Sequence, residues 1–223
     1  MTVLSVIQNA AVLCNMPRPN SALSSTEAFE QEMSVLLARA GQEIIRRHDW
    51  GRLIKTQDYS TNGTSTVFTV PSDFQRLVMN SAVSYGTVNY IRGGLSDAEW
   101  RLQARQAGAS HRYRLLGNSL HVLPAVSLAN SPITVQYISR NWLLNNGGTP
   151  IDVATADNDV PVLPERLLTS CLVWMWKRLK KQSYQSELAE YEDDLAQEIA
   201  SDRNFRIPTS GAREAVAKME ARA

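Results

Sequence analysis

The chain has few of the residues on which most metal and redox sites depend: among 223 residues there are two cysteines and three histidines. Cys14 and Cys171 both lie within apolar patterns of helical period, and neither has the spacing of a disulfide pair or a metal ligand, which predicts two reduced, buried thiols. His48, His111 and His121 show no His-Glu-x-x-His or similar spacing, whereas a zinc site needs three or four convergent ligands. The sequence therefore predicts no metal and no cofactor.

Net charge and long apolar runs are also missing. Lys and Arg number 23 against 22 Asp and Glu, so no global basic field indicates nucleic acid or an anionic membrane as a partner. No stretch reaches the roughly 18 uninterrupted apolar residues that a membrane span requires. The apolar segment 1–14 lacks the basic leader of a signal peptide. We therefore expect synthesis and residence in the cytosol, without a membrane partner.

Motifs for phosphate binding and nucleophilic catalysis are absent from the sequence as well. The two Gly-Gly pairs, at 93–94 and 147–148, are not followed by a helix that carries Lys-Ser or Lys-Thr, so turns are their expected use. No Gly-x-Ser-x-Gly elbow is present. These absences predict that the chain is not an enzyme.

Carboxylates are the residues that leave an enzymatic alternative open. Asp157 and Asp159 fall in a polar segment, and the trio at 192–194 is expected on the solvent side of a helix, where charge runs are usually hydrated. A pair such as Asp73 and Glu99 could act in glycan cleavage. A cell-wall hydrolase is therefore one alternative.

Apolar spacing predicts four helices, two at each end of the chain. They are expected at residues 3–14, at about 25–48, from 164 onward and at about 183–201. Ser24 and Glu27 have the spacing of a capping box that would open the second helix, and Pro164 suits the first position of the third. The basic residues that follow Trp174 and Trp176 favour a helix end carrying cations over a nucleic-acid surface.

The middle of the chain, from about 50 to 139, changes to short alternating runs rich in Val, Thr, Tyr and Ile, which are typical of strands. Asn62-Gly63 predicts a hairpin between 52–59 and 65–70, and Gly117-Asn118 predicts a second one. Strands are expected at 75–85, 87–92, 111–116, 119–123 and 133–139, a short helix capped by Ser96 at 96–107, and a loop at 141–160.

This order of elements predicts an α+β fold. Neither terminal helix pair can bury its apolar stripe alone, so we expect the two pairs to form one helical bundle. The expected organisation is a bundle from 1–50 and 161–203, an inserted antiparallel β-rich domain at 51–160, and an extended, flexible C-terminal tail at 204–223. The weak apolar pattern of that tail is typical of a segment that orders on binding.

Three passages follow one another in a recognisable order: IIRRHDW at 44–50, VPSDFQRL at 70–77, and YRLLGNSLHVLP at 113–124 followed by ITVQY at 133–137. Together they resemble the head-to-tail adaptor, or connector, proteins of tailed bacteriophages, of the tail-tube adaptor or tail accessory factor type. In the second passage Pro71 is expected to fix the end of a strand, Asp73 to cap the turn and Phe74 to fill the core.

The resemblance implies a structural role at the head–tail junction of a virion, after assembly in the host cytoplasm. It implies a homo-oligomeric ring of about twelve copies beneath the portal protein, with a tail, nozzle or tail-tube protein below. Double-stranded DNA would pass through the lumen without sequence-specific binding. A different virion component, such as a head-completion or tail-terminator protein, is the alternative within the same class.

The C-terminal tail is expected to reach the portal. Its sizeable apolar side chains are the expected anchors, with arginines as polar partners. The predicted portal-binding residues are Arg203, Phe205, Arg206, Ile207, Arg213, Val216 and Met219.

Overall fold

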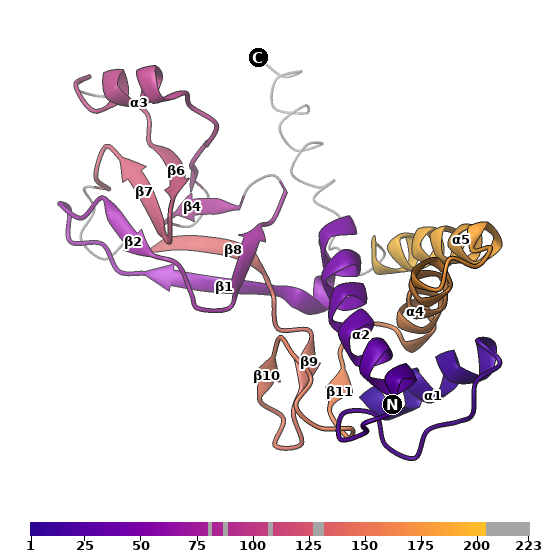
Figure 1. The fold of residues 1–223 in the computed structure, drawn as a ribbon. Helices are drawn as coiled ribbons and strands as arrows, with labels where there is room; N and C mark the ends of the chain where they lie inside the picture. The colour runs from indigo at the N-terminus through magenta and orange to yellow at the C-terminus, as the bar shows by residue number, and fades with distance from the viewer. Residues whose placement is uncertain (80–81, 87–88, 107–108, 127–131, 204–223) are drawn as a thin grey trace. The chain divides into compact units, whose positions relative to one another are not determined.

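The computed structural model describes residues 1–79, 82–86, 89–106, 109–126 and 132–203 (Figure 1). The chain divides into two compact units. The helical unit contains residues 1–41 and the described residues from 163 onward, and the β-rich unit is formed by described residues within 42–162. Helices and antiparallel sheets are both present, which confirms the predicted α+β class.

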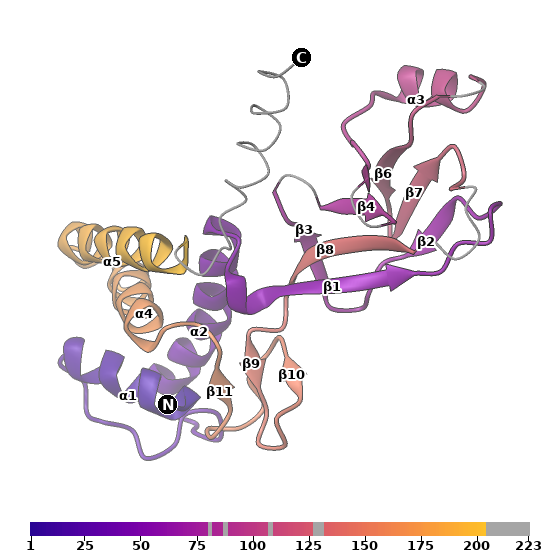
Figure 2. The ribbon, with the colours of Figure 1, turned by 180° about the vertical axis from the view of Figure 1, so that it is seen from behind.

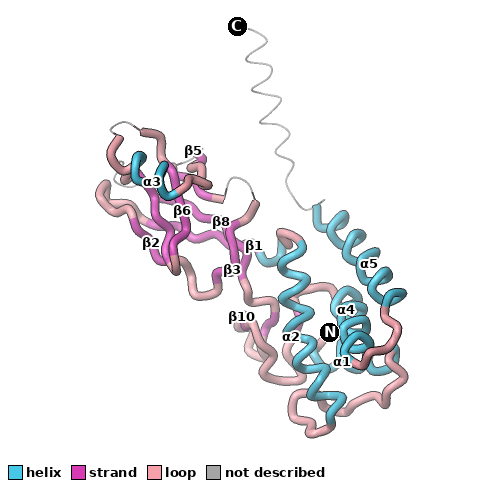
Figure 3. Tube along the Cα trace, turned by 45° about the horizontal axis from the view of Figure 1, so that its top comes forward, coloured by secondary structure: helices cyan, strands magenta, loops and turns pink. Residues whose placement is uncertain are grey.

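The helical unit contains helices from both ends of the chain (Figure 3). These helices are α1 (Val3–Leu13), the first part of α2 (Ala28–Arg47), α4 (Glu165–Leu179) and α5 (Gln185–Arg203). Helix α4 is central, because it packs against both α1 and α5. The rings of Phe29 and Trp176 meet edge to face, with centroids 5.6 Å apart, and join α2 to α4.

Buried apolar stripes hold these helices together. On α1 the side chains of Val3, Ile7 and Ala10 are fully buried, as their spacing predicts. Cys14 and Cys171 are both buried, and neither forms a disulfide bond within the described residues, as expected for small apolar side chains. The bundle core is therefore built from residues that lie more than 150 positions apart in the sequence.

The start of α2 differs from the prediction. The helix begins at Ala28, and the expected capping box between Ser24 and Glu27 is not formed. Ser24 Oγ shares a 2.6 Å hydrogen bond with Ser21 Oγ, and the Glu27 N–H donates to Ser25 Oγ. Serine hydroxyls thus bond to each other and to nearby backbone, and this competes with helix formation in the preceding turn.

The described residues of the β-rich unit form three antiparallel sheets, and strand β8 (Ile133–Ser139) is central to the largest (Figure 2). One edge of β8 pairs along its length with β1. Its other edge pairs with β3 near the C-terminal end and with β4 near the N-terminal end, and β5 extends the sheet from β4. The bounds are β1 Ile54–Tyr59, β3 Phe74–Leu77, β4 Val83–Tyr85 and β5 Asn89–Tyr90.

The second sheet has the order β2-β7-β6, and the third has the order β10-β9-β11. Their bounds are β2 Val67–Thr69, β6 Arg112–Leu116 and β7 Ser119–Leu123, then β9 Leu143–Leu144, β10 Pro150–Ile151 and β11 Val160–Pro161. A 3₁₀ turn at Gly51–Leu53 precedes β1, and the short helix α3 (Asp97–Gln103) precedes β6.

One predicted hairpin is wrong and the other is confirmed. The strands on either side of Asn62-Gly63 do not pair with each other: β1 pairs with β8, and β2 pairs with β7. The turn itself forms, with Gly63 at φ +78°, but β8 offers β1 a six-residue register rich in buried side chains. Strands β6 and β7 form the second hairpin, with Leu116 opposite Ser119.

Three further segments differ from the sequence-based expectation. Residues 75–85 form two strands, β3 and β4, and the strand expected at 87–92 is limited to β5 within the described residues. The segment 141–160, expected to be a loop, contains the small third sheet. Trp142 is buried there and its indole N–H donates to the carbonyl of Asp152, which draws the segment together. The Ser96 cap of α3 is confirmed, as a capping box with Glu99.

A separate apolar cluster forms the core of the β-rich unit. It includes Phe68, Val83, Leu120 and Ile133. Phe74, expected to fill the core, is partly buried and packs against this cluster.

Candidate functional site

The three passages singled out in the sequence meet through polar side chains of the β-rich unit. The first contact is between Arg76, on β3, and Asp49, which follows α2. The guanidinium of Arg76 forms an ion pair with Asp49 and also donates to the carbonyls of His48, at 2.9 Å, and Ile45, at 3.3 Å. The last carbonyls of a helix have no partner within the helix, so Arg76 completes the end of α2.

Asp49 is itself almost fully enclosed. Its second carboxylate oxygen accepts a 2.9 Å hydrogen bond from the backbone N–H of Met79. The next residue, Trp50, is buried, and its indole N–H donates to the carbonyl of Ile44 at 2.7 Å. The passage 44–50 therefore stops the helix and attaches its end to the sheet.

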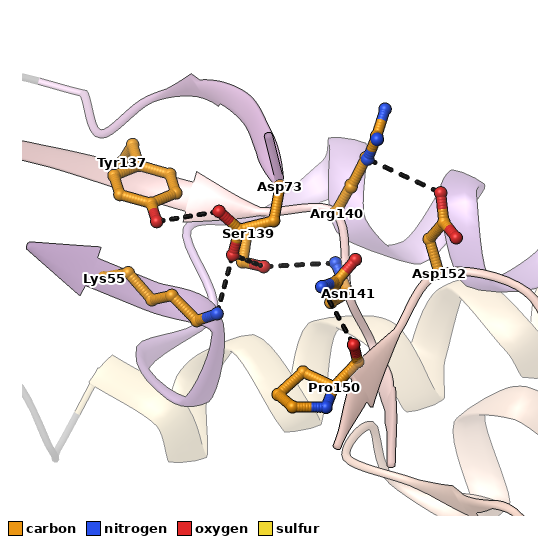
Figure 4. A network of polar contacts seen from close by, with 8 residues as sticks. All are labelled: Lys55, Asp73, Tyr137, Ser139, Arg140, Asn141, Pro150 and Asp152. Atoms are coloured by element: carbon orange, nitrogen blue, oxygen red, sulfur yellow. Dashed lines mark hydrogen bonds and ion pairs between the residues drawn. The ribbon is translucent and has the colours of Figure 1, made fainter. Parts of the chain in front are cut away.

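The second contact is a cluster around Asp73 (Figure 4). Its carboxylate accepts hydrogen bonds from Lys55 Nζ at 2.6 Å, Ser139 Oγ at 2.8 Å and Tyr137 OH at 2.9 Å. The prediction that Asp73 caps its own turn is wrong. Three donors from β1 and β8 converge on the carboxylate, whereas a local cap would offer it only neighbouring backbone N–H groups.

The Asp73 cluster fixes the ionisation of its members. Burial acts to raise the pKa of Asp73, but the hydrogen bonds from Lys55, Ser139 and Tyr137 outweigh it, and the net pKa lies below the ordinary value. Burial, together with the hydrogen bond to Asp73, raises the pKa of Tyr137. Asp73 is thus held as an anion that accepts and does not donate.

The cluster continues toward the third sheet (Figure 4). Ser139 Oγ accepts from the backbone N–H of Asn141, whose side-chain amide donates to the carbonyl of Pro150. Arg140 and Asp152 form an ion pair at 3.5 Å. Asp73 of the second passage and the residues at the end of β8 therefore connect the large sheet to the small one.

The two carboxylates considered for glycan cleavage, Asp73 and Glu99, both have a lowered pKa. A general acid in that chemistry needs a raised pKa, and the pKa of Asp73 is lowered. Glu99 is exposed, and hydrogen bonds from the hydroxyl and backbone N–H of Ser96 lower its pKa too. Both shifts run against the role of a general acid.

Two other carboxylates are buried, contrary to expectation. Asp159 accepts from the backbone N–H groups of Thr155 and Ala156 and so closes a turn. Asp194, expected on the solvent side of α5, is only 3% exposed and pairs with Arg166 at 2.7 Å. Its position three residues after the buried Tyr191 places it on the packed face of the helix, a spacing that could have been read from the sequence.

The basic residues at the end of α4 are paired within the helical unit. Lys177 Nζ lies 2.5 Å from Glu187, and the pKa of Glu187 is lowered chiefly by this hydrogen bond. Lys180 Nζ lies 2.6 Å from Glu32. The preceding Trp174 and Trp176 are buried. These contacts confirm the interpretation as a helix end with cations rather than a stacking surface.

A pocket of about 500 Å³ was not expected from the sequence. It lies between α1, α4 and α5 of the helical unit. Its lining comprises Asn9, Leu13, Glu165, Arg166, Thr169, Ser170, Val173, Lys177, Glu187, Glu190 and Asp194. Polar residues that recur at helical spacing on α4, such as Glu165, Thr169 and Lys177, were the available signal.

Of the predicted portal-binding residues, Arg203 is the last residue of α5. The other six (Phe205, Arg206, Ile207, Arg213, Val216 and Met219) lie outside the described residues. Within the described ranges, no helix has the length and apolar character needed to cross a membrane. The same ranges hold no group of three or more His, Cys, Asp or Glu residues placed to bind a metal ion.

The chain matches a known protein family. A family model described as SU10 adaptor protein matches residues 1–216, a span that includes both units and all three passages. A search of curated proteins finds no match.

Proposed function

Because the chain belongs to the SU10 adaptor protein family, a family of phage head–tail adaptors, we propose that it forms a ring beneath the portal protein. The ring contains about twelve copies, connects the portal to the tail and leaves a lumen for the genome. The family match over residues 1–216 is the observation that carries this proposal.

The contacts of Asp49, Asp73 and Arg76, which lie in the first two passages, support a mechanical role. Asp49 and Arg76 tie a helix end to the sheet, and Asp73 ties β1 to β8. Charged residues at such positions could equally have lined a cleft. Here Asp73 accepts hydrogen bonds from Lys55 and Tyr137. We take these links as support for a component that holds the head and the tail together.

The charge of the chain suits a passage for DNA. The formal net charge is +1, with basic and acidic residues almost equal in number. A strongly basic lumen would bind phosphates and release counterions, and so would retain the DNA. A near-neutral ring holds its protein neighbours while the duplex passes without sequence-specific contacts.

Two protein partners follow from this position. The portal lies above, and the C-terminal segment from Arg203 to Met219 binds it through the apolar anchors and arginines named above. A tail, nozzle or tail-tube protein lies below. The site of action is the head–tail junction of the virion, reached after assembly in the host cytoplasm.

The test is the mass of the purified chain alone and with portal rings from the same phage. We expect a monomer alone and a ring only on the portal, at one adaptor per portal subunit. A chain that does not bind the portal but binds the end of an isolated tail tube would be a tail terminator. That result would contradict the proposal. A matched control is portal rings from an unrelated phage, which should recruit no chain.

A further inference from the structure

Arginines gather on one side of the β2-β7-β6 sheet. Arg92 and Arg112 lie opposite each other in a β-bridge, so their side chains point to the same face. Arg114, two residues after Arg112 on β6, shares this face. Its guanidinium carbon lies 4.6 Å from the centroid of the Trp100 ring, which places helix α3 against the same side of the sheet.

Helix α3 adds two more arginines to this side. Arg101 is exposed next to Trp100, and Arg105 is exposed one helical turn further along the chain. Exposed apolar side chains accompany them: Leu102 is 65% exposed and Leu116, on the same face of β6 as Arg114, is 55% exposed. We call these four arginines the arginine surface: Arg92, Arg101, Arg105 and Arg112.

The arginine surface lacks counter-charges. Arg114 pairs with Asp97 at 2.9 Å, whereas the four arginines of the surface form no ion pair with any residue that the structure describes. The one other acidic residue within 89–126 is Glu99, which accepts from Ser96. Like charges opposite each other on neighbouring strands are destabilising, so an anionic partner lowers the free energy of this face.

Helix α5 has the complementary charge. Residues 185–202 include seven acidic residues and no Lys or Arg. Glu187 and Asp194 are paired within the helical unit, with Lys177 and Arg166 respectively. Two others, Glu190 and Asp193, are exposed and form no ion pair within the described ranges.

The exposed side of α5 also has a suitable shape. Ala189, Asp193, Ala196 and Ala200 are all exposed and recur at spacings of 4, 3 and 4, so they form one row along the helix. Alanines leave room for long side chains to lie along the row and reach the carboxylates beside it. Arginine and leucine side chains are long enough to do so, and arginine is enriched at protein interfaces.

We propose that the arginine surface of one copy binds helix α5 of a second copy. Guanidinium groups would pair with Glu190 and Asp193 across the contact, and Leu102 and Leu116 would pack on the alanine row. The contact joins two different surfaces, so each copy keeps one free surface of each kind and can bind a further neighbour.

This inference deepens the proposed function and rests on it for its role, because the contact provides the lateral bond between neighbours in the ring. A single contact of exposed charges is weak, which agrees with a chain that is monomeric alone. On the portal, neighbouring copies are held close together, and the same contact is then favoured. Neutralising each arginine surface with a neighbouring α5 also keeps these cations from retaining DNA.

The experiment is static light scattering of the full-length chain over a range of concentrations, which detects weak attraction between monomers. Two variants reverse the charge of one surface each: Arg101→Glu with Arg105→Glu, and Glu190→Arg with Asp193→Arg. We expect each to lower the apparent association constant at least about fivefold. Combining all four substitutions retains the net charge of the wild type and should restore the association.

The matched control is Arg39→Glu with Arg46→Glu, which makes the same charge change at exposed positions of α2. It should retain most of the association. The wild-type association should also weaken as the salt concentration rises from about 50 to 300 mM. Equal association constants in the wild type and both surface variants, or a combined variant that stays as weak as either one, would overturn the proposal.

A duplex DNA of random sequence tests the competing partner. Binding of the duplex that is lost in Arg101→Glu with Arg105→Glu, while association between copies is unchanged, would assign the surface to DNA and overturn the proposal. Rings that form equally well on the portal with these two substitutions would overturn the contact but not the proposed function. Association that follows the charge pattern without any ring on the portal would support the contact and contradict the proposed function.

Discussion

Arg76 and Asp49 form an ion pair at the C-terminal end of α2, although 27 residues separate them in the sequence. The same guanidinium reaches two carbonyls of the helix end, and the same carboxylate reaches the backbone of Met79. This pair therefore links the C-terminal end of α2 to β3, which pairs with β8.

Replacing Arg76 with Leu should strongly destabilise the chain. Asp49 has a side chain only 3% exposed, so the substitution leaves a buried charge without its partner. We expect a loss of about 3 kcal/mol in the free energy of unfolding. Urea unfolding followed by tryptophan fluorescence measures it. Arg101→Leu, on the exposed face of α3, is the control and should cost less than about 0.5 kcal/mol, and a comparably small loss for Arg76→Leu would refute the assignment.

The Asp73 cluster predicts a dependence of stability on pH. The pKa of Asp73 is lower in the folded chain than in the unfolded chain, so its contribution is present above the unfolded value of about 3.8 and is lost as the pH falls through the folded value. Asp73→Asn should therefore be less stable than the wild type at about pH 6, and the difference should shrink toward about pH 3. A difference that stays constant across this range would contradict the role given to the carboxylate.

Cys14, which follows the C-terminal end of α1, should react slowly. Burial, chiefly, raises its pKa to about 11, and Lys177 and Glu187 act on it in opposite directions. The thiolate is the reactive form, so alkylation at about pH 8 should be roughly a hundredfold slower in the folded chain than in urea. Peptide mapping after iodoacetamide treatment gives the rate, and rapid labelling of the native chain would show that the helical unit opens readily there.

Deletion of residues 204–223 should separate folding from assembly. The described helices and sheets end at Arg203, so we expect the shortened chain to fold, with a cooperative urea transition. Binding to portal rings should be abolished, because the expected anchors are removed. Full-strength portal binding by the shortened chain would place the portal contact elsewhere.

An enzymatic role makes the opposite prediction to ours on peptidoglycan. We expect purified wild-type chain to leave the turbidity of a peptidoglycan suspension unchanged, with lysozyme as the positive control. Clearing by the wild type that is lost in Asp73→Ala and in Glu99→Ala would establish a hydrolase.

The elements that the sequence predicts well are those defined by nearby residues. Apolar residues at helical spacing locate α1, α4 and α5, and the Ser96–Glu99 capping box and the Gly117 turn form as expected. Each depends on contacts between residues a few positions apart, which periodicity and turn chemistry describe directly.

The elements that it misses depend on distant partners. The alternation of β1 indicates a strand but does not identify β8, about 75 residues later, as its partner. The sequence around Asp73 predicts a local cap. In the structure its carboxylate instead accepts hydrogen bonds from Lys55, Tyr137 and Ser139, on β1 and β8. The pocket likewise requires α1 and α5 to flank α4, which no local pattern specifies.

The position of the chain in the particle tests the adaptor assignment most directly. Cryo-electron microscopy of virions, with the chain located by a tag on its N-terminus, would show where the copies lie. The account predicts a ring directly below the portal, with the DNA path open through its centre. Density for the chain at the far end of the tail, or away from the axis of the portal, would contradict it.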